Sequence, residues 1–241
     1  MASIALLHFL ICTKIPQKLE KNKKLMKRLQ QTDIRRIVVL TGARRVGKTT
    51  IQYQMIEDLL KNGIPPQKIL FLSMDHPMLK LSGFNDILEC YHENIYAEQD
   101  VYFFFDEVQY AHDWDKWLKT IYDMQPDTKV VATGSASPVL AKGNQESGTG
   151  RWSVIQVPTM SFFEYCELLD LDLPDLSEDL KITTLARKTE QDRTHIMLQL
   201  SRIQNHFNRY LLVGGFPELA IADNDLMAQQ IKIGRASCRE R

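Results

Sequence analysis

The sequence predicts an α/β fold in which a parallel β-sheet lies between two layers of helices, followed by a partial helical segment. Short, continuous apolar segments suit strands that are buried on both faces. Amphipathic segments of helical period alternate with them. Several strands end in glycine, acidic or hydroxyl residues, at the edge where open α/β sheets bind ligands. Together these observations predict a three-layer, ligand-binding sheet.

The first predicted strand, Ile37–Leu40, leads into the glycine-containing loop Gly42–Thr49. The loop reads GARRVGKT and matches Gly-x-x-x-x-Gly-Lys-Ser/Thr, the phosphate-binding P-loop or Walker A motif. Backbone N–H groups of such a loop, with the N-terminus of the next helix, form an electropositive seat for a polyphosphate. Gly42 and Gly47 supply backbone angles and a close approach that a Cβ would block. The alternative is a strand–helix turn that binds nothing.

Two side chains of the loop have predicted roles. Lys48 reaches the β- and γ-phosphates, and Thr49 offers its hydroxyl to Mg²⁺. The two arginines occupy variable positions of the motif, where they favour anions without an assigned role. The predicted nucleotide-binding residues here are Gly42, Ala43, Arg44, Arg45, Val46, Gly47, Lys48, Thr49 and Thr50. The helix predicted after the loop has one apolar side made of Ile51, Met55, Leu59 and Leu60.

A central strand, Val101–Phe105, ends in the carboxylates Asp106 and Glu107, as in a Walker B motif. Asp106 would hold Mg²⁺ directly or through water, and Glu107 would position and deprotonate the attacking water. The stretch between Lys48 and Asp106 is long enough for two helical crossovers and one more strand, which we place at Lys68–Ser73. The alternative is a strand that ends in two solvated acids.

The next strand, Lys129–Ala132, ends in a segment rich in hydroxyl groups. Thr133 or Ser135 could hydrogen-bond the γ-phosphate or the attacking water, a role called sensor 1. The same residues suit an ordinary turn with Ser135 or Ser137 as a helix N-cap, so the choice stays open. Before this strand, helical spacing predicts a core-facing side made of Trp114, Trp117, Leu118 and Ile121.

Arg151 completes the predicted catalytic set with Lys48 and Glu107. It follows a loop of small residues, Gly143–Gly150, that could close over nucleotide. A guanidinium delivered to the γ-phosphate can contribute about 10³–10⁵ in rate. The alternative is an arginine that opens the strand Trp152–Val157 and pairs with a surface acid.

Outside this core the chain is predicted to be helical. A basic lead helix covers about 16–30, a Ser-capped helix about 161–169, and a longer helix about 190–212, which ends at the C-cap glycines Gly214 and Gly215. The predicted division is a tail and lead helix over 1–32, a nucleotide-binding core over 33–158, a helical linker with the start of a further domain over 159–232, and a foreign tail over 233–241.

These motifs together resemble the AAA-type ATPases of bacteria and archaea that pair an AAA domain with a C-terminal domain of unknown function. The resemblance runs from Ile37 to about Ala220. It implies ATP binding, hydrolysis, and a sheet whose sensor strand lies between the Walker A and Walker B strands, but no known client. The stretches that carry it are GARRVGKTT, FFFDEVQ, HDWDKWLKTIYD, VVATGSAS, GRWSVIQVPTMSFFEY and FNRYLLVGGFPELA.

The foreign tail is Ile233–Arg241, IGRASCRER. It back-translates codon for codon as ATC GGA AGA GCG TCG TGT AGG GAA AGA, part of a common short-read sequencing adapter. We interpret it as translated adapter and expect the natural protein to be truncated near Lys232, the alternative being a natural basic tail. Leu211 and Leu212 would then lie on an incomplete domain and be partly uncovered.

Composition narrows the function classes. Lys plus Arg and Asp plus Glu are balanced at 30 each, so no global basic field argues for nucleic acid. The four cysteines are scattered and the six histidines form no metal-binding motif, which suits a cytoplasmic protein whose metal is Mg²⁺ carried with ATP. The apolar segment Ile4–Cys12 is too short to span a membrane.

We therefore expect a Mg²⁺-dependent ATPase that couples hydrolysis to a conformational switch on an unknown protein or nucleic-acid client. The alternative is a nucleotide-dependent binding or regulatory module with little turnover. A small-molecule kinase is a third reading, which Glu107 beside Asp106 disfavours because it points to activated water. No membrane partner is expected, and homo-oligomerisation stays open.

Overall fold

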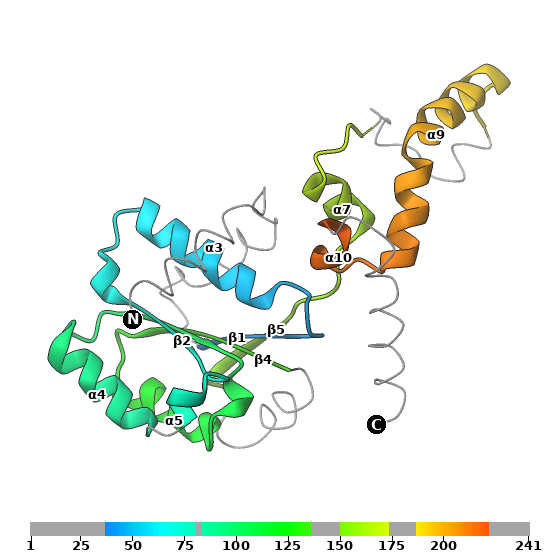
Figure 1. The fold of residues 1–241 in the computed structure, drawn as a ribbon. Coiled ribbons are helices and arrows are strands. Elements are labelled where there is room, and N and C mark those ends of the chain that lie inside the picture. Colours follow the sequence, from blue (N-terminus) through cyan, green and yellow to red (C-terminus); the bar gives the residue numbers. More distant parts are fainter. Residues whose placement is uncertain (1–36, 81–82, 136–149, 174–186, 222–241) are drawn as a thin grey trace, which may run out of the picture. The chain divides into compact units, whose positions relative to one another are not determined.

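The structure, a computed structural model, describes residues 37–80, 83–135, 150–173 and 187–221 (Figure 1). The chain divides into two compact units, Met1–Pro158 and Thr159–Arg241. The predicted lead helix, the loop from Gly143 to Thr149, the middle of the acidic linker and the segment Ile233–Arg241 lie outside the described residues. Among the described helices, none combines the length and apolar character needed to cross a membrane.

The first unit is built on a five-stranded, all-parallel sheet with the order β2-β3-β4-β1-β5. Strand β4, which carries the predicted sensor residues, lies between the Walker A strand β1 and the Walker B strand β3, so the order implied by the family resemblance is confirmed. The strands are β1 Ile37–Gly42, β2 Ile69–Ser73, β3 Tyr102–Asp106, β4 Lys129–Ser135 and β5 Trp152–Gln156.

Helices cover both faces of this sheet, which confirms the three-layer prediction (Figure 1). Helix α3, Lys48–Lys61, lies over one face, whereas α4, Phe84–Asn94, and α5, Trp114–Met124, lie over the other. Successive strand residues point to opposite faces, and both sets are apolar. The core under α4 and α5 includes Val39, Phe103, Phe105, Leu88, Leu118 and Ile121.

Each strand differs from its predicted bounds by one to three residues, and β2 and β4 show the physical reasons. Strand β2 begins at Ile69 rather than Lys68, because Pro66–Lys68 forms a 3-10 turn. Strand β4 runs on to Ser135 rather than ending at Ala132, so the turn given as an alternative for Thr133–Ser135 does not form. The strand continues because β1 continues beside it: Thr133 is in register with Leu40 and Ser135 with Gly42.

The second unit contains three described helices, α7 Phe162–Leu168, α9 Glu190–Val213 and α10 Pro217–Ile221. Ser161 caps α7 in a reciprocal capping box with Glu164. Gly214 ends α9 in the left-handed conformation (φ 75°), as its C-cap pattern predicted. Leu211 and Leu212 of α9 are 60% and 75% exposed. The truncation from which their exposure was expected stays a prediction.

Candidate nucleotide-binding site

The predicted phosphate-binding loop joins the end of β1 to the start of α3. Gly42 has φ 153°, and a Cβ there would lie 2.4 Å from the carbonyl oxygen of Val157. Gly47 has φ 92° and forms the N-cap of α3. Both positions therefore need glycine, one for a close backbone approach and the other for a left-handed turn. The loop ends with the N–H groups of the first turn of α3 free of helical partners, as anion binding requires.

Lys48 lies beneath this loop, with a side chain that is only 5% exposed. Its Nζ donates to the carbonyl oxygens of Gly42, at 3.2 Å, and Ala43, at 2.9 Å. Burial lowers the pKa of Lys48, while the nearby charges of Glu107 and Asp106 act in the opposite direction. The ammonium group is thus held by two loop carbonyls at the edge where both carboxylates converge.

Thr49 and the carboxylate of Asp106 meet directly across the site. The Thr49 hydroxyl lies 3.1 Å from Oδ1 and 2.9 Å from Oδ2 of Asp106, and the Thr133 hydroxyl also donates to Oδ1. Burial raises the pKa of Asp106, and the two hydroxyl donors lower it in part. A hydroxyl beside a carboxylate is the oxygen-rich set that a hard divalent cation prefers, so these residues fit the Mg²⁺ role predicted for them.

Glu107 is placed by backbone geometry as well as by sequence. Its main chain is left-handed, with φ 52°, and its N–H donates to the Thr133 hydroxyl at 3.0 Å. Thr133 therefore bridges both acidic residues, because it donates to Asp106 and accepts from Glu107. The side-chain amide of Gln109 donates to the Glu107 carboxylate. Neighbouring strands β3 and β4 end side by side, which brings these groups together.

Arg151 does not lie beside the lysine, threonines and acidic residues described above. It precedes β5, and its carbonyl oxygen accepts from the N–H of Ile37 at the start of β1, whereas the phosphate-binding loop follows the end of β1. Its guanidinium lies 3.1 Å from a carboxylate oxygen of Asp123. Within one chain Arg151 thus lies at the amino ends of the strands, opposite to the phosphate-binding loop. Its pairing with Asp123 is the surface pairing that was the alternative to a catalytic role. The side chain of the other sensor candidate, Ser135, lies outside the described part of the structure.

Three residues near the site had no predicted role. Gln52 is fully buried, and its amide donates to the carbonyl oxygens of Phe105, at 3.1 Å, and Val131, at 3.2 Å. A polar residue between Ile51 and Met55 on the apolar side of α3 was the available signal. Gln109 and Tyr110 belong to a 3-10 turn after Glu107, and the Tyr110 hydroxyl accepts from Arg44 at 3.0 Å. No rule of sequence spacing predicts that this turn contacts the phosphate-binding loop.

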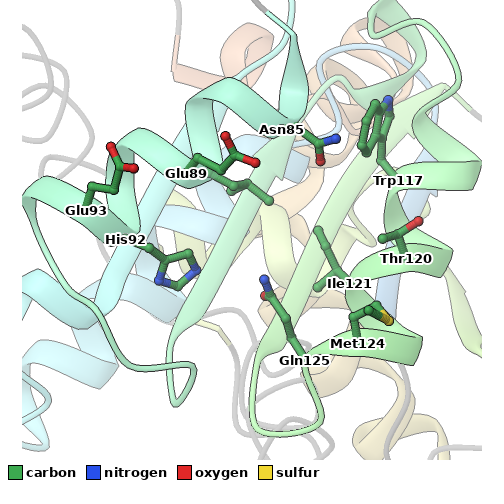
Figure 2. Close-up of a pocket in the computed structure, with 10 residues that line it drawn as sticks. Asn85, Glu89, His92, Glu93, Trp117, Thr120, Ile121, Met124 and Gln125 are labelled. Atoms are coloured by element: carbon green, nitrogen blue, oxygen red, sulfur yellow. The ribbon is translucent and has the colours of Figure 1, made fainter.

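A cavity of about 290 Å³ lies elsewhere in the first unit, between α4 and α5 (Figure 2). Its α4 wall carries acidic and polar side chains, and its α5 wall is partly apolar. None of the predicted nucleotide-binding residues lines it. The lining residues are Asn85, Leu88, Glu89, His92, Glu93, Trp117, Thr120, Ile121, Met124 and Gln125.

Comparisons with known proteins assign most of the first unit to a family. The model of the AAA domain family matches residues 34–166, more than half of the chain. Uncharacterized protein MJ1637 of Methanocaldococcus jannaschii is 28% identical over 203 residues, which cover 81% of this chain and 41% of that protein. An uncharacterized protein of Haemophilus influenzae is 24% identical over 212 residues, which cover 86% of this chain and 46% of that protein. The chain thus spans less than half the length of these relatives.

Among solved structures, the Hsp104–ADP complex of S. cerevisiae matches with a TM-score of 0.48 and 17% sequence identity. The match covers 64% of this chain and 24% of the Hsp104 chain.

Proposed function

Because the chain belongs to the AAA domain family, we propose that it binds ATP with Mg²⁺ and hydrolyses it to ADP and phosphate. One observation carries the proposal. The Thr49 hydroxyl contacts the Asp106 carboxylate within 3.1 Å, at the edge of the sheet where Lys48 and Glu107 also lie. This arrangement combines a phosphate-binding cation, a pair of metal ligands and a candidate base, which are the parts that ATP hydrolysis needs.

Each group has one proposed role. The loop N–H groups and Lys48 bind the β- and γ-phosphates, which replace the carbonyl oxygens of Gly42 and Ala43 as acceptors for the Lys48 ammonium. Thr49 and Asp106 hold Mg²⁺, which neutralises charge on the phosphates when it is bound. Glu107 accepts the proton of the attacking water. Thr133 keeps the two acidic residues in register and is the better-supported sensor, because it touches both of them.

The nucleotide cycle would act on a client, which we propose is a protein or a nucleic acid. In this proposal, binding of ATP with Mg²⁺ separates Thr49 from Asp106, and release of the products after hydrolysis allows the contact to re-form, so the site alternates between a state without this hydrogen bond and one with it. Such a two-state element is what couples a local chemical change to a partner. The client itself is left to experiment, since the relatives extend well beyond the matched region.

Phosphate release from MgATP without any added acceptor tests the reaction. Glu107→Gln should bind ATP as the wild type does and hydrolyse it about 10²–10⁴-fold more slowly, because an amide cannot accept the proton of water. Glu98→Gln is the matched control: this exposed residue precedes β3 at the other edge of the sheet and should leave turnover unchanged.

The outcomes separate the candidate functions. Tight ATP binding without phosphate release would replace the ATPase with a nucleotide-dependent binding module. Turnover that requires an acceptor would instead indicate a kinase. Full turnover by Glu107→Gln would show that another group is the base.

A further inference from the structure

We propose that Gln109 is a positioning residue that holds the Glu107 carboxylate in its working orientation, an inference that rests on the proposed hydrolysis. The amide Nε2 of Gln109 donates to Oε2 of Glu107. Glu107 follows β3 directly, and Gln109 lies within the next element, the 3-10 turn Val108–Tyr110. The contact is therefore local in sequence and depends on the backbone geometry of that turn.

Glu107 needs such a partner because its backbone is fixed while its side chain is not. The left-handed main chain and the N–H bond to Thr133 fix the Cα position. Beyond Cα, a glutamate keeps several torsions, and the last of them is broad and weakly restrained. Within the described part of the chain, the hydrogen bond that restrains this carboxylate comes from Gln109.

Gln109 is itself held in place by the turn that carries it. Val108 is buried, and the N–H groups of Tyr110 and Ala111 donate to the carbonyls of Glu107, at 3.1 Å, and Val108, at 2.9 Å. The Tyr110 hydroxyl accepts from Arg44 of the phosphate-binding loop at 3.0 Å. The turn is therefore tied to the core on one side and to the loop on the other, so the backbone that carries the Gln109 side chain is fixed.

The chemistry of the amide suits this task. A neutral donor orients a carboxylate without adding charge beside Lys48, whereas a cationic side chain would pair with Glu107 and compete with its role as a base. The Glu107 carboxylate that Gln109 contacts follows Asp106 directly in the chain, at the end of β3 where Thr49 meets Asp106. Gln109 thus holds the carboxylate where the attacking water is needed.

The test is the steady-state hydrolysis of MgATP by Gln109→Ala. We expect kcat to fall about ten- to hundredfold with KM nearly unchanged, because a reacting group displaced by ~1 Å can cost about 10²-fold in rate. Gln109→Glu keeps the length but loses the donor, so it should be as slow as alanine, and Gln109→Asn should recover part of the rate. Gln99→Ala, an exposed glutamine before β3, is the matched control and should leave kcat unchanged.

A double variant distinguishes positioning from a structural role. In the Glu107→Gln background, Gln109→Ala should cause no further loss of rate, because the group that it positions has already been removed. Losses that multiply, an unchanged kcat, or a kcat that rises in Gln109→Ala would each overturn the inference, and a rise would identify Gln109 as a brake. Should Gln109→Ala fold poorly, Gln109→Glu provides the same comparison.

Failure of the inference can be told from failure of the proposed function. Phosphate release by the wild type with a Gln109→Ala variant that is equally fast removes only the positioning role. A wild type that releases no phosphate, with or without Mg²⁺, removes the hydrolysis and the inference together.

Discussion

The ammonium of Lys48 is hydrogen-bonded to carbonyl oxygens of its own loop, at 3.2 and 2.9 Å. Those contacts satisfy a buried cation while leaving it within reach of an incoming phosphate. A polyphosphate would exchange two neutral acceptors for charged ones, which makes stronger hydrogen bonds. Lys48, whose charge is costly to bury without partners, would therefore make stronger hydrogen bonds when a polyphosphate is bound.

Lys48→Ala should accordingly remove most ATP binding. MgATP at a hundredfold excess over Kd should stabilise the wild type by about 2.7 kcal/mol, and the variant should show little of this protection. Thermal unfolding with and without MgATP measures the difference. Lys61→Ala, at the exposed end of the same helix, is the control and should be protected as the wild type is. Equal protection of Lys48→Ala would remove the assignment of the loop.

At the scale of residues, sequence motifs located Lys48, Thr49, Asp106 and Glu107, because strand and loop spacing alone decides their positions. The contacts of the Thr133 hydroxyl with both acidic residues depend on the register of β4 against β3, which the sequence does not give. The placement of Arg151 depended on which end of β5 it occupies. That end is set by the parallel direction of the strand, and it carries the arginine away from the loop.

At the scale of elements, Gln52 connects the helix after the loop to the centre of the sheet. Its amide spans the gap to the carbonyl oxygens of Phe105 in β3 and Val131 in β4. Helix α3 is thereby held against the strands that carry the acidic residues and the sensor threonine. Apolar packing by Ile51 and Met55 would allow the helix to slide, whereas two directional bonds fix its position.

We expect Gln52→Leu to destabilise the first unit by about 1–3 kcal/mol, since two buried hydrogen bonds are lost. The loss falls toward the lower value because Oε1 of Gln52 has no partner in the described part of the structure. Urea unfolding followed by tryptophan fluorescence reports this unit, which contains all three tryptophans. Glu57→Ala, which removes a surface pair with Lys61 on the same helix, should change stability by less than about 1 kcal/mol. If the two variants lowered the free energy of unfolding equally, the buried hydrogen bonds of Gln52 would contribute no more than a surface ion pair.

Apolar continuity predicted the strands of the sheet, because a strand covered on both faces has few alternatives. It did not predict where β4 ends, since Thr133–Ser135 is polar and extends only because β1 lies beside it. The side chain of Trp117 illustrates a similar limit. Helical spacing placed it in the core with Trp114, whereas it lies partly exposed on the wall of the α4–α5 cavity. Tertiary neighbours decide such positions.

At the scale of the whole molecule, the candidate site lies within one unit. Lys48, Thr49, Asp106, Glu107 and Thr133 all belong to Met1–Pro158, and so does Val157, which packs against Gly42. Within the described ranges, the hydrogen bonds reported for the site join residues of the first unit. The first unit is therefore expected to bind nucleotide alone.

A chain that ends at Pro158 should keep the thermal protection given by MgATP. A chain that ends at Gly150 lacks β5 and should fail to fold, because β1 would lose one of its two neighbours. Loss of MgATP protection in a well-folded chain ending at Pro158 would show that the second unit contributes to binding.

The strand order also governs what happens while the protein is being synthesised. Both neighbours of β1 come from the last part of the first unit: Ile37 donates to the carbonyl of Arg151, and Val157 donates to the carbonyl of Thr41. At about 5–20 residues per second, β1 waits on the order of ten seconds after its own synthesis before β5 exists. For most of that interval neither β4 nor β5, the two neighbours of this apolar strand in the sheet, has been made, which is the condition that favours aggregation or chaperone capture. The phosphate-binding loop is thus among the first parts of this unit to be made and among the last to take shape.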